Sequence, residues 1–290
     1  MPQPNLFIIG TPRSGTTSVA KWLSRHPDVV GGLRKEPMFH ATDLPSPKHT
    51  TDLEEYLQNW AGAESVPMRL DASTWYLFSK EAATSIASMS PDARFIVLLR
   101  DPVDLIASLH THHVFIGVEK VRDFGTAVFG ERPPSGDEFR RSIVYLDVVR
   151  LPGQLRRFYE HFPEERFTFV DFNRLAQDPE AAHLTLLDDL GLSRVPLSEY
   201  PHLNRGRHER VAGINRRLGR ERRTPAPGRF SMGRVMSRLN TVVGRPSVDP
   251  EMRRRILGVI SPEIDELAEL LDRDLSDWKR VRKDDEESVG

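Results

Sequence analysis

Short apolar runs recur along the first two thirds of the chain, and each one ends in glycine or in polar residues. They cover residues 6–9, 94–99 and 166–170, and a segment with helical periodicity follows each of them. Continuous apolar runs of this length are typical of strands that are buried on both faces of a parallel sheet. The alternation of strands and helices therefore predicts an α/β fold with helices on both faces of a central parallel sheet.

The same pattern predicts several further elements. A helix is expected over residues 17–25, where His26 and Pro27 stop it, and helices also over 103–113 and 179–190. Residues 68–71 add a short strand, and two long amphipathic helices are predicted, over 136–160 and 250–274.

The composition changes between residues 205 and 246, which hold twelve arginines, no lysine and two acidic residues. We interpret the chain as a single domain, residues 1–290, with an irregular Arg-rich insertion at 205–246 and a C-terminal helix. Within the insertion, residues 228–243 place four apolar side chains on one helical face: Met232, Val235, Met236 and Leu239. Three interpretations are open: a helix packed on the core, a lid over the site, or a peripheral membrane contact.

Overall charge and cysteine content narrow the class of protein. The 290 residues have a formal net charge of −1, with 38% hydrophobic and 29% charged residues, which favours a soluble globular protein without nucleic-acid partners. The absence of cysteine excludes disulfides and a thiol nucleophile. The apolar run near the start is too short for a signal peptide, and no window approaches a membrane span. We expect a cytoplasmic protein.

The turn after the first predicted strand is the first candidate site. Its sequence, GTPRSG over residues 10–15, has the spacing of a nucleotide P-loop, but Thr16 and Thr17 follow where a P-loop has lysine and serine or threonine. A strand–turn–helix connection presents backbone N–H groups and the positive helix end to an anion. We therefore expect anion binding by a group of donor-rich residues: Arg13, Ser14, Gly15, Thr16, Thr17 and Ser18.

A second candidate lies after the strand at 94–99. Arg100 leaves the carboxyl end of that strand, where open α/β sheets bind ligands, and it is followed by Asp101 and Pro102. Ser108 comes eight residues after Arg100, about two helical turns away. Taken alone, the segment is equally compatible with a salt-bridged helix start.

Together, PRSGTT at residues 12–17 and RDP at 100–102 with Ser108 resemble the sulfotransferases that use 3′-phosphoadenosine-5′-phosphosulfate (PAPS). The resemblance is strongest to the glycan, tyrosylprotein-type and bacterial branches, and RKEPMF at 34–39 and LGL at 190–192 extend it. It implies a P-loop-NTPase-like three-layer sandwich, PAPS as co-substrate and no metal. It also implies that the turn cradles the 5′-phosphosulfate while Arg100 and Ser108 bind the 3′-phosphate.

The resemblance also suggests catalytic roles. Glu36 is the candidate base for the acceptor proton, unless it belongs to a solvated charged loop. Arg13 would stabilise charge electrostatically, since arginine cannot act as an acid at neutral pH. His112, one turn beyond Ser108, would line the active site or lie on the surface. Arg205 and Arg207 fall where the family has a basic loop that closes over the nucleotide, so the resemblance implies that they are additional phosphate ligands.

One position departs from the glycan branch, which often carries lysine where this chain has Ala72. Either Arg13 carries more of the charge, or the acceptor geometry differs. Trp75 and Tyr76, four and five residues beyond Asp71, are expected to line the acceptor pocket or to belong to the core.

The sequence thus predicts a sulfotransferase that moves a sulfuryl group to a hydroxyl or amine. The expected acceptor is a glycan, a glycolipid or another small molecule such as a secondary metabolite. Two alternatives remain: a P-loop-like nucleotide kinase or NTPase, against which the missing lysine and Walker-B acid argue, and a homologue that binds the nucleotide without catalysis. The sequence gives no indication of the oligomeric state.

Overall fold

A five-stranded parallel sheet forms the centre of the molecule, with the strand order β2-β3-β1-β4-β5. The computed structural model describes residues 1–44, 49–130, 144–200, 207–209, 241–243 and 247–281. The strands of this sheet are β1 (Leu6–Gly10), β2 (Val29–Gly31), β3 (Met68–Asp71), β4 (Arg94–Leu99) and β5 (Phe167–Asp171). The predicted central parallel sheet is confirmed.

Side chains of β1 and β4 alternate between two hydrophobic cores. Phe7 and Ile9 of β1 enter one core, whereas Leu6 and Ile8 enter the other, and β4 divides its side chains in the same way. Successive strand residues point to opposite faces, so a strand covered on both sides must be apolar at every position. This requirement explains the uninterrupted apolar runs that predicted these strands.

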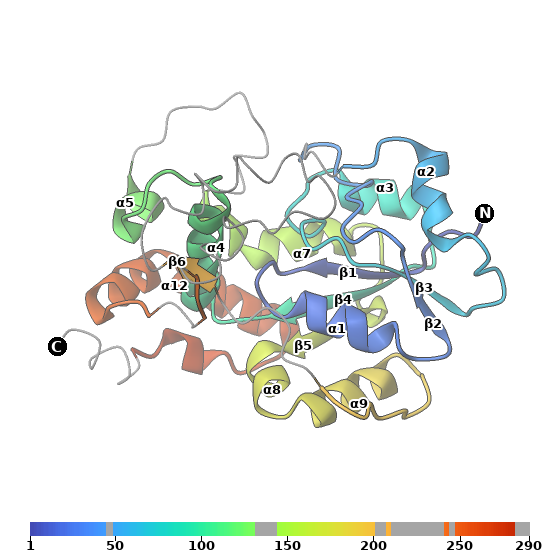
Figure 1. The fold of residues 1–290 in the computed structure, drawn as a ribbon. Coiled ribbons are helices and arrows are strands. Elements are labelled where there is room, and N and C mark those ends of the chain that lie inside the picture. The colour runs from blue at the N-terminus through green and yellow to red at the C-terminus, as the bar shows by residue number, and fades with distance from the viewer. Residues whose placement is uncertain (45–48, 131–143, 201–206, 210–240, 244–246, 282–290) are drawn as a thin grey trace.

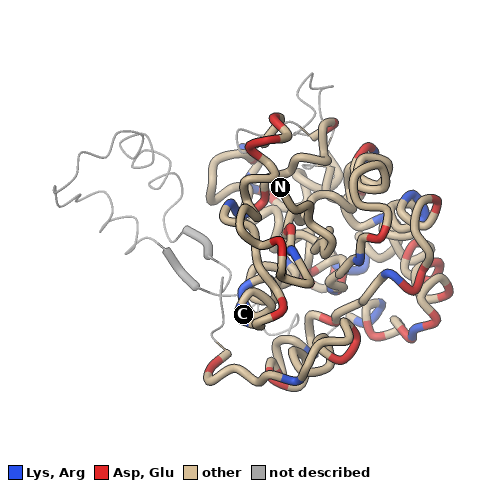
Figure 2. Tube along the Cα trace, turned by 90° about the vertical axis from the view of Figure 1, so that its right-hand side faces the viewer, with Lys and Arg blue, Asp and Glu red and all other residues tan. Residues whose placement is uncertain are grey.

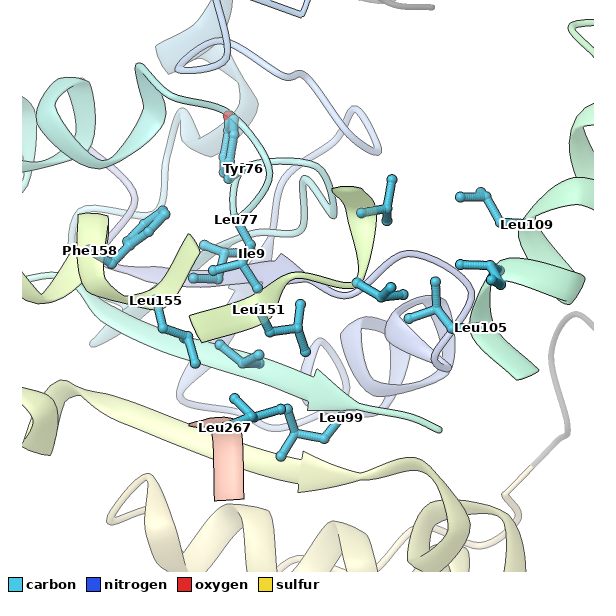
Figure 3. Packing of buried hydrophobic residues seen from close by; sticks show 14 of the residues in the cluster. Ile9, Tyr76, Leu77, Leu99, Leu105, Leu109, Leu151, Leu155, Phe158 and Leu267 are labelled. Atoms are coloured by element: carbon cyan, nitrogen blue, oxygen red, sulfur yellow. The ribbon is translucent and has the colours of Figure 1, made fainter. Parts of the chain in front are cut away.

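Helices cover both faces of the sheet (Figure 1). One face carries α1 (Thr16–Leu23), α8 (Phe172–Gln177) and α9 (Pro179–Asp189). The larger core on the other face is closed by α3 (Ala82–Met89), α4 (Pro102–Ile116), α7 (Leu151–Tyr159) and α12 (Pro250–Leu271). Figure 3 shows Ile9, Leu99, Leu155 and Phe158 meeting in that core. The three-layer sandwich is thereby confirmed.

The remaining elements are short. They are α2 (Leu53–Leu57), α5 (Phe124–Phe129), α6 (Tyr145–Val148), and the 3-10 helices Gln58–Trp60, Glu164–Arg166 and Ser276–Lys279. A separate antiparallel pair consists of β6 (Arg207–Glu209) and β7 (Thr241–Val243). The three-residue strand β2 was not predicted, because so short a segment shows no hydrophobic period.

Capping residues set the ends of the two longest helices. The Asp101 side chain accepts from the N–H groups of Val103 and Asp104 at the start of α4, and Gly117 in the left-handed region ends the helix. Asp249 caps α12 in the same way, and Asp272 with φ 47° ends it. The helix predicted over 250–274 is therefore correct but stops at residue 271.

Two predicted helices need correction. Residues 144–160 do not form one continuous helix, because α6 ends at Val148 and α7 begins at Leu151. Pro152 has no N–H and its ring would clash with the carbonyl of residue 148 in a continuous helix, which favours a break at this point. Residues 136–143, like most of the predicted helix 228–243, lie outside the described residues. The last three residues of the segment 228–243 form β7, and threonine and valine are residue types that favour strands.

Charged residues of both signs are distributed along the described trace (Figure 2). Within the part of the chain that the structure describes, none of the helices is long and apolar enough to span a membrane.

Candidate active site

The phosphate turn, residues 10–18, connects β1 directly to α1. Gly15 has φ +90°, which lies in the left-handed region, and a Cβ there would lie 2.6 Å from Cδ2 of Leu175. Only glycine meets both conditions without strain. The backbone N–H groups that follow Gly15 open α1, whose positive end therefore points at the turn.

Hydroxyl groups within the turn fasten it to the neighbouring strand. Thr11 Oγ1 donates to the carbonyl oxygen of Leu98 at 2.8 Å and lies 2.6 Å from Ser14 Oγ. The Ser14 side chain is completely buried, so Ser14 can offer a ligand its backbone rather than its hydroxyl. Thr16 and Ser18 are also buried, whereas Thr17 is partly exposed.

The two candidate phosphate motifs meet in space. Arg100 Nη1 donates to the carbonyl oxygen of Arg13 at 2.5 Å, and Arg13 Nε donates to Ser108 Oγ at 3.3 Å. The guanidinium of Arg100 also stacks on Phe172, 4.5 Å from the ring centroid. Phe172, which begins α8, was not predicted as part of the site, since nothing in its sequence neighbourhood distinguishes it from a core aromatic.

Positive charge is concentrated at this meeting point. Arg100 is 7% exposed, and burial lowers the pKa of Arg13. A guanidinium stays charged at neutral pH even so. Two desolvated guanidinium groups beside the positive end of a helix favour an anion with several oxygens, such as a phosphate or a sulfate.

Glu36 approaches the phosphate turn through its neighbour Lys35. Lys35 Nζ donates to Thr17 Oγ1 at 2.7 Å and lies 3.8 Å from Glu36 Oε1. Thr74 Oγ1 donates to the same carboxylate oxygen at 3.4 Å. Lys35 was not predicted as a site residue. Its position directly before Glu36, in a stretch already matched to the family, was the available signal.

Strained backbone gathers at the same place. Among the described residues, four that are not glycine have positive φ: Arg13 at 65°, Glu36 at 54°, Met38 at 57° and Asp272 at 47°. Three of them belong to the phosphate turn or to the segment of Glu36. Such conformations persist only where the surrounding structure imposes them, and they are common at functional sites.

Of the two interpretations left open for Tyr76, the structure supports the core and not the acceptor pocket. The Tyr76 side chain is fully buried and its hydroxyl donates to Asp71 Oδ2 at 2.9 Å, which places it in the interior beneath the site. Trp75 is only partly buried and its ring stacks on His113 at 6.4 Å between centroids.

The other predicted site residues lie further along. His112 is on α4, one turn beyond Ser108, partly exposed and with its ring 6.3 Å from that of His113. Arg205 lies outside the described residues. The backbone of Arg207 belongs to β6, which contacts α4. Their roles stay predictions.

A buried arginine from α12 supports the start of α4. Arg253, 1% exposed, donates from Nη1 to Asp101 Oδ2 at 3.0 Å and from Nη2 to Asp104. Asp101 directly follows Arg100, so this ion pair fixes the helix start beside the arginine of the site. No sequence pattern connected residues 149–152 positions apart.

Comparison with known proteins identifies the family. The sequence model described as "Sulfotransferase domain" matches residues 3–202, more than half of the chain. The chain belongs to the sulfotransferase family, as its two phosphate motifs predicted.

Curated relatives share this region. Human heparan sulfate glucosamine 3-O-sulfotransferase 3B1 is 25% identical over 202 residues, which cover 70% of this chain and 50% of that protein. The bifunctional heparan sulfate N-deacetylase/N-sulfotransferase 1 of Caenorhabditis elegans is 24% identical over 204 residues, or 68% of this chain and 23% of that protein. The aligned region thus spans half or less of these relatives.

A solved structure shares the fold. The sulfotransferase from Alicyclobacillus acidocaldarius superimposes with a TM-score of 0.72 and 23% identity, covering 97% of this chain and all of that one. The likeness extends over nearly the whole chain and shows a common architecture.

Proposed function

We propose that the protein transfers the sulfuryl group of PAPS to a hydroxyl or amine of an acceptor molecule. The observation that carries the proposal is the junction of the two motifs, where Arg100 reaches the backbone of Arg13 and Arg13 reaches Ser108. A donor with phosphate groups on both the 3′ and the 5′ side needs two anion sites close together. The phosphate turn would hold the 5′-phosphosulfate, and Arg100 with Ser108 the 3′-phosphate.

The reaction is an in-line displacement at sulfur. The acceptor oxygen or nitrogen forms a bond to sulfur, its proton passes to the Glu36 carboxylate, and the bond from sulfur to the 5′-phosphate oxygen breaks. The electron pair leaves on that phosphate, and the product is adenosine 3′,5′-bisphosphate. Arg13, Lys35 and the N–H groups of the phosphate turn would stabilise the charge that develops there.

A sugar acceptor is the first class to test. The curated relatives are named for sulfation of heparan sulfate, one at a hydroxyl and the other at nitrogen. Heparan sulfate and its N-desulfated form separate these two chemistries, because only the second offers free amines. Labelled sulfate transferred to one, to both or to neither would assign the acceptor atom or exclude this glycan.

Donor binding is tested by calorimetric titration with adenosine 3′,5′-bisphosphate, ADP and ATP, with and without magnesium. We expect tight, magnesium-independent binding of the bisphosphate. Preference for magnesium-ATP would contradict the proposal and support a nucleotide kinase or NTPase. Binding of the bisphosphate without transfer to any acceptor would favour a non-catalytic homologue.

Replacing Arg100 with alanine should weaken binding of adenosine 3′,5′-bisphosphate by about 10- to 100-fold, because charge-assisted hydrogen bonds to the 3′-phosphate are lost. Calorimetry of the variant gives the affinity, and thermal unfolding checks that the fold is retained. Arg156→Ala, which removes an exposed arginine on α7, is the control and should bind normally. An unchanged affinity in Arg100→Ala would remove Arg100 from the donor site.

Replacing Lys35 with methionine should weaken PAPS binding by about tenfold, because the ammonium beside Thr17 would no longer face the phosphosulfate. Lys21→Met, at the exposed far end of α1, is the matched control. If both variants bind PAPS like the parent protein, Lys35 is a surface lysine with no part in the site.

A further inference from the structure

A single buried carboxylate lies beneath the candidate base. Asp71, the last residue of β3, is 1% exposed and accepts three side-chain hydroxyls. Ser73 Oγ donates to its Oδ1 at 2.7 Å, while the hydroxyls of Tyr56 and Tyr76 donate to Oδ2 at 2.8 and 2.9 Å. Burial raises the pKa of Asp71 to about 6, and these three donors oppose the rise.

All three hydroxyls also contact one short segment, residues 38–40. Ser73 Oγ accepts from the backbone N–H of Met38 at 3.1 Å, and the Tyr76 hydroxyl accepts from that of His40 at 3.4 Å. The Tyr56 hydroxyl lies 3.2 Å from Nε2 of His40. Residues 38–40 are thus connected to Asp71 three times, each time through one hydroxyl.

The hydrogen-bond directions are mutually consistent. The Tyr56 hydroxyl uses its one proton in the hydrogen bond to Asp71. The hydrogen bond between Tyr56 and His40 therefore requires an N–H at Nε2 of His40, which donates to the Tyr56 oxygen. Nδ1 of His40 then accepts from Ser85 Oγ at 2.8 Å. Burial lowers the pKa of His40 to about 3, so the ring is neutral and has one N–H, as this arrangement requires.

The segment held in this way is the one that carries Glu36. Glu36 and Met38 both have positive φ, a conformation that the backbone would leave without outside support. Thr74, within the same 73–76 stretch, donates directly to the Glu36 carboxylate at 3.4 Å. The hydroxyls that are bonded to Asp71 and the threonine that is bonded to Glu36 therefore hold the same segment.

We propose that Asp71 is a positioning residue which acts through Ser73, Tyr56 and Tyr76 to hold residues 36–40 in the conformation that presents Glu36. The inference rests on the proposed function for its catalytic consequence. The hydrogen-bond arrangement itself can be tested without any activity. A buried carboxylate suits the task, because it accepts several hydroxyls at once and orients each of them.

Amide hydrogen exchange is the direct test. In Asp71→Asn and Ser73→Ala, the N–H groups of Met38 and His40 should exchange about five- to tenfold faster, while β4 keeps its protection. Ser90→Ala removes another buried serine hydroxyl, bonded to the carbonyl of Pro4, and should leave residues 36–40 unchanged. If Asp71→Asn does not fold, Ser73→Ala decides alone. Unchanged exchange at residues 36–40 would overturn the proposal.

A double-mutant cycle tests the catalytic consequence. Asp71→Asn should lower the transfer rate about tenfold in the parent protein, with little change in affinity for adenosine 3′,5′-bisphosphate, and should cause no further loss in the Glu36→Gln background. Equal losses in both backgrounds would mean that Asp71 does not act through Glu36. If the parent protein neither binds the bisphosphate nor transfers sulfate, the proposed function fails, and the exchange experiment still decides the positioning role.

Discussion

Glu36→Gln is expected to lower the rate of sulfuryl transfer by about a hundred- to ten-thousand-fold, the range typical of losing a general base. Glutamine keeps the shape of the side chain and can still accept from Thr74, but it cannot take the acceptor proton. Binding of adenosine 3′,5′-bisphosphate should stay within about twofold, since the proposed phosphate contacts are made by Arg13, Arg100 and Ser108 and not by Glu36. Initial rates with labelled PAPS, together with calorimetry, measure both quantities.

The control for this experiment is Glu54→Gln, an exposed glutamate in the first turn of α2, which should be fully active. A Glu36→Gln variant with normal turnover would show that another group removes the proton. His112→Asn would then be the next variant, because His112 lies one turn beyond Ser108 on α4.

The features that were predicted correctly are local in sequence. The strand at 94–99 and the phosphate turn are each recognisable within about fifteen consecutive residues, because strand burial and turn geometry act on neighbours. The same holds for the RDP segment, where Asp101 and Pro102 mark a helix start. The prediction of one helix over 136–160 was wrong for a local reason as well. It followed the helical spacing of the apolar residues and gave too little weight to Pro152, which interrupts a helix.

The features that were missed join distant parts of the chain. Lys35 meets Thr17, Asp71 meets Tyr56, and Arg253 meets Asp101, and none of these pairs has a spacing that a local pattern detects. A lysine in a charged loop or an arginine on an amphipathic helix normally faces solvent. Only the packing of α12 against α4 shows that Arg253 is buried.

Arg253→Met is expected to lower the free energy of unfolding by about 3–5 kcal/mol, because it removes a buried arginine that pairs with the buried carboxylate of Asp101. Methionine preserves most of the side-chain volume, so the loss reports the charge rather than a cavity. Chemical denaturation of both proteins measures the difference. The variant should also bind adenosine 3′,5′-bisphosphate more weakly, since Asp101 fixes the start of α4 next to Arg100.

Arg254→Met is the matched control. Arg254 follows Arg253 on α12 but is exposed, so its replacement should change the free energy of unfolding by no more than about 0.5 kcal/mol. The double variant Arg253→Met with Asp101→Asn also removes the buried carboxylate charge and should recover part of the stability, since the Asp104 carboxylate that remains is partly exposed. Equal stability of Arg253→Met and the parent protein would mean that the ion pair does not hold α12 to α4. Weaker nucleotide binding at unchanged stability would instead mean that the ion pair serves only to position Arg100.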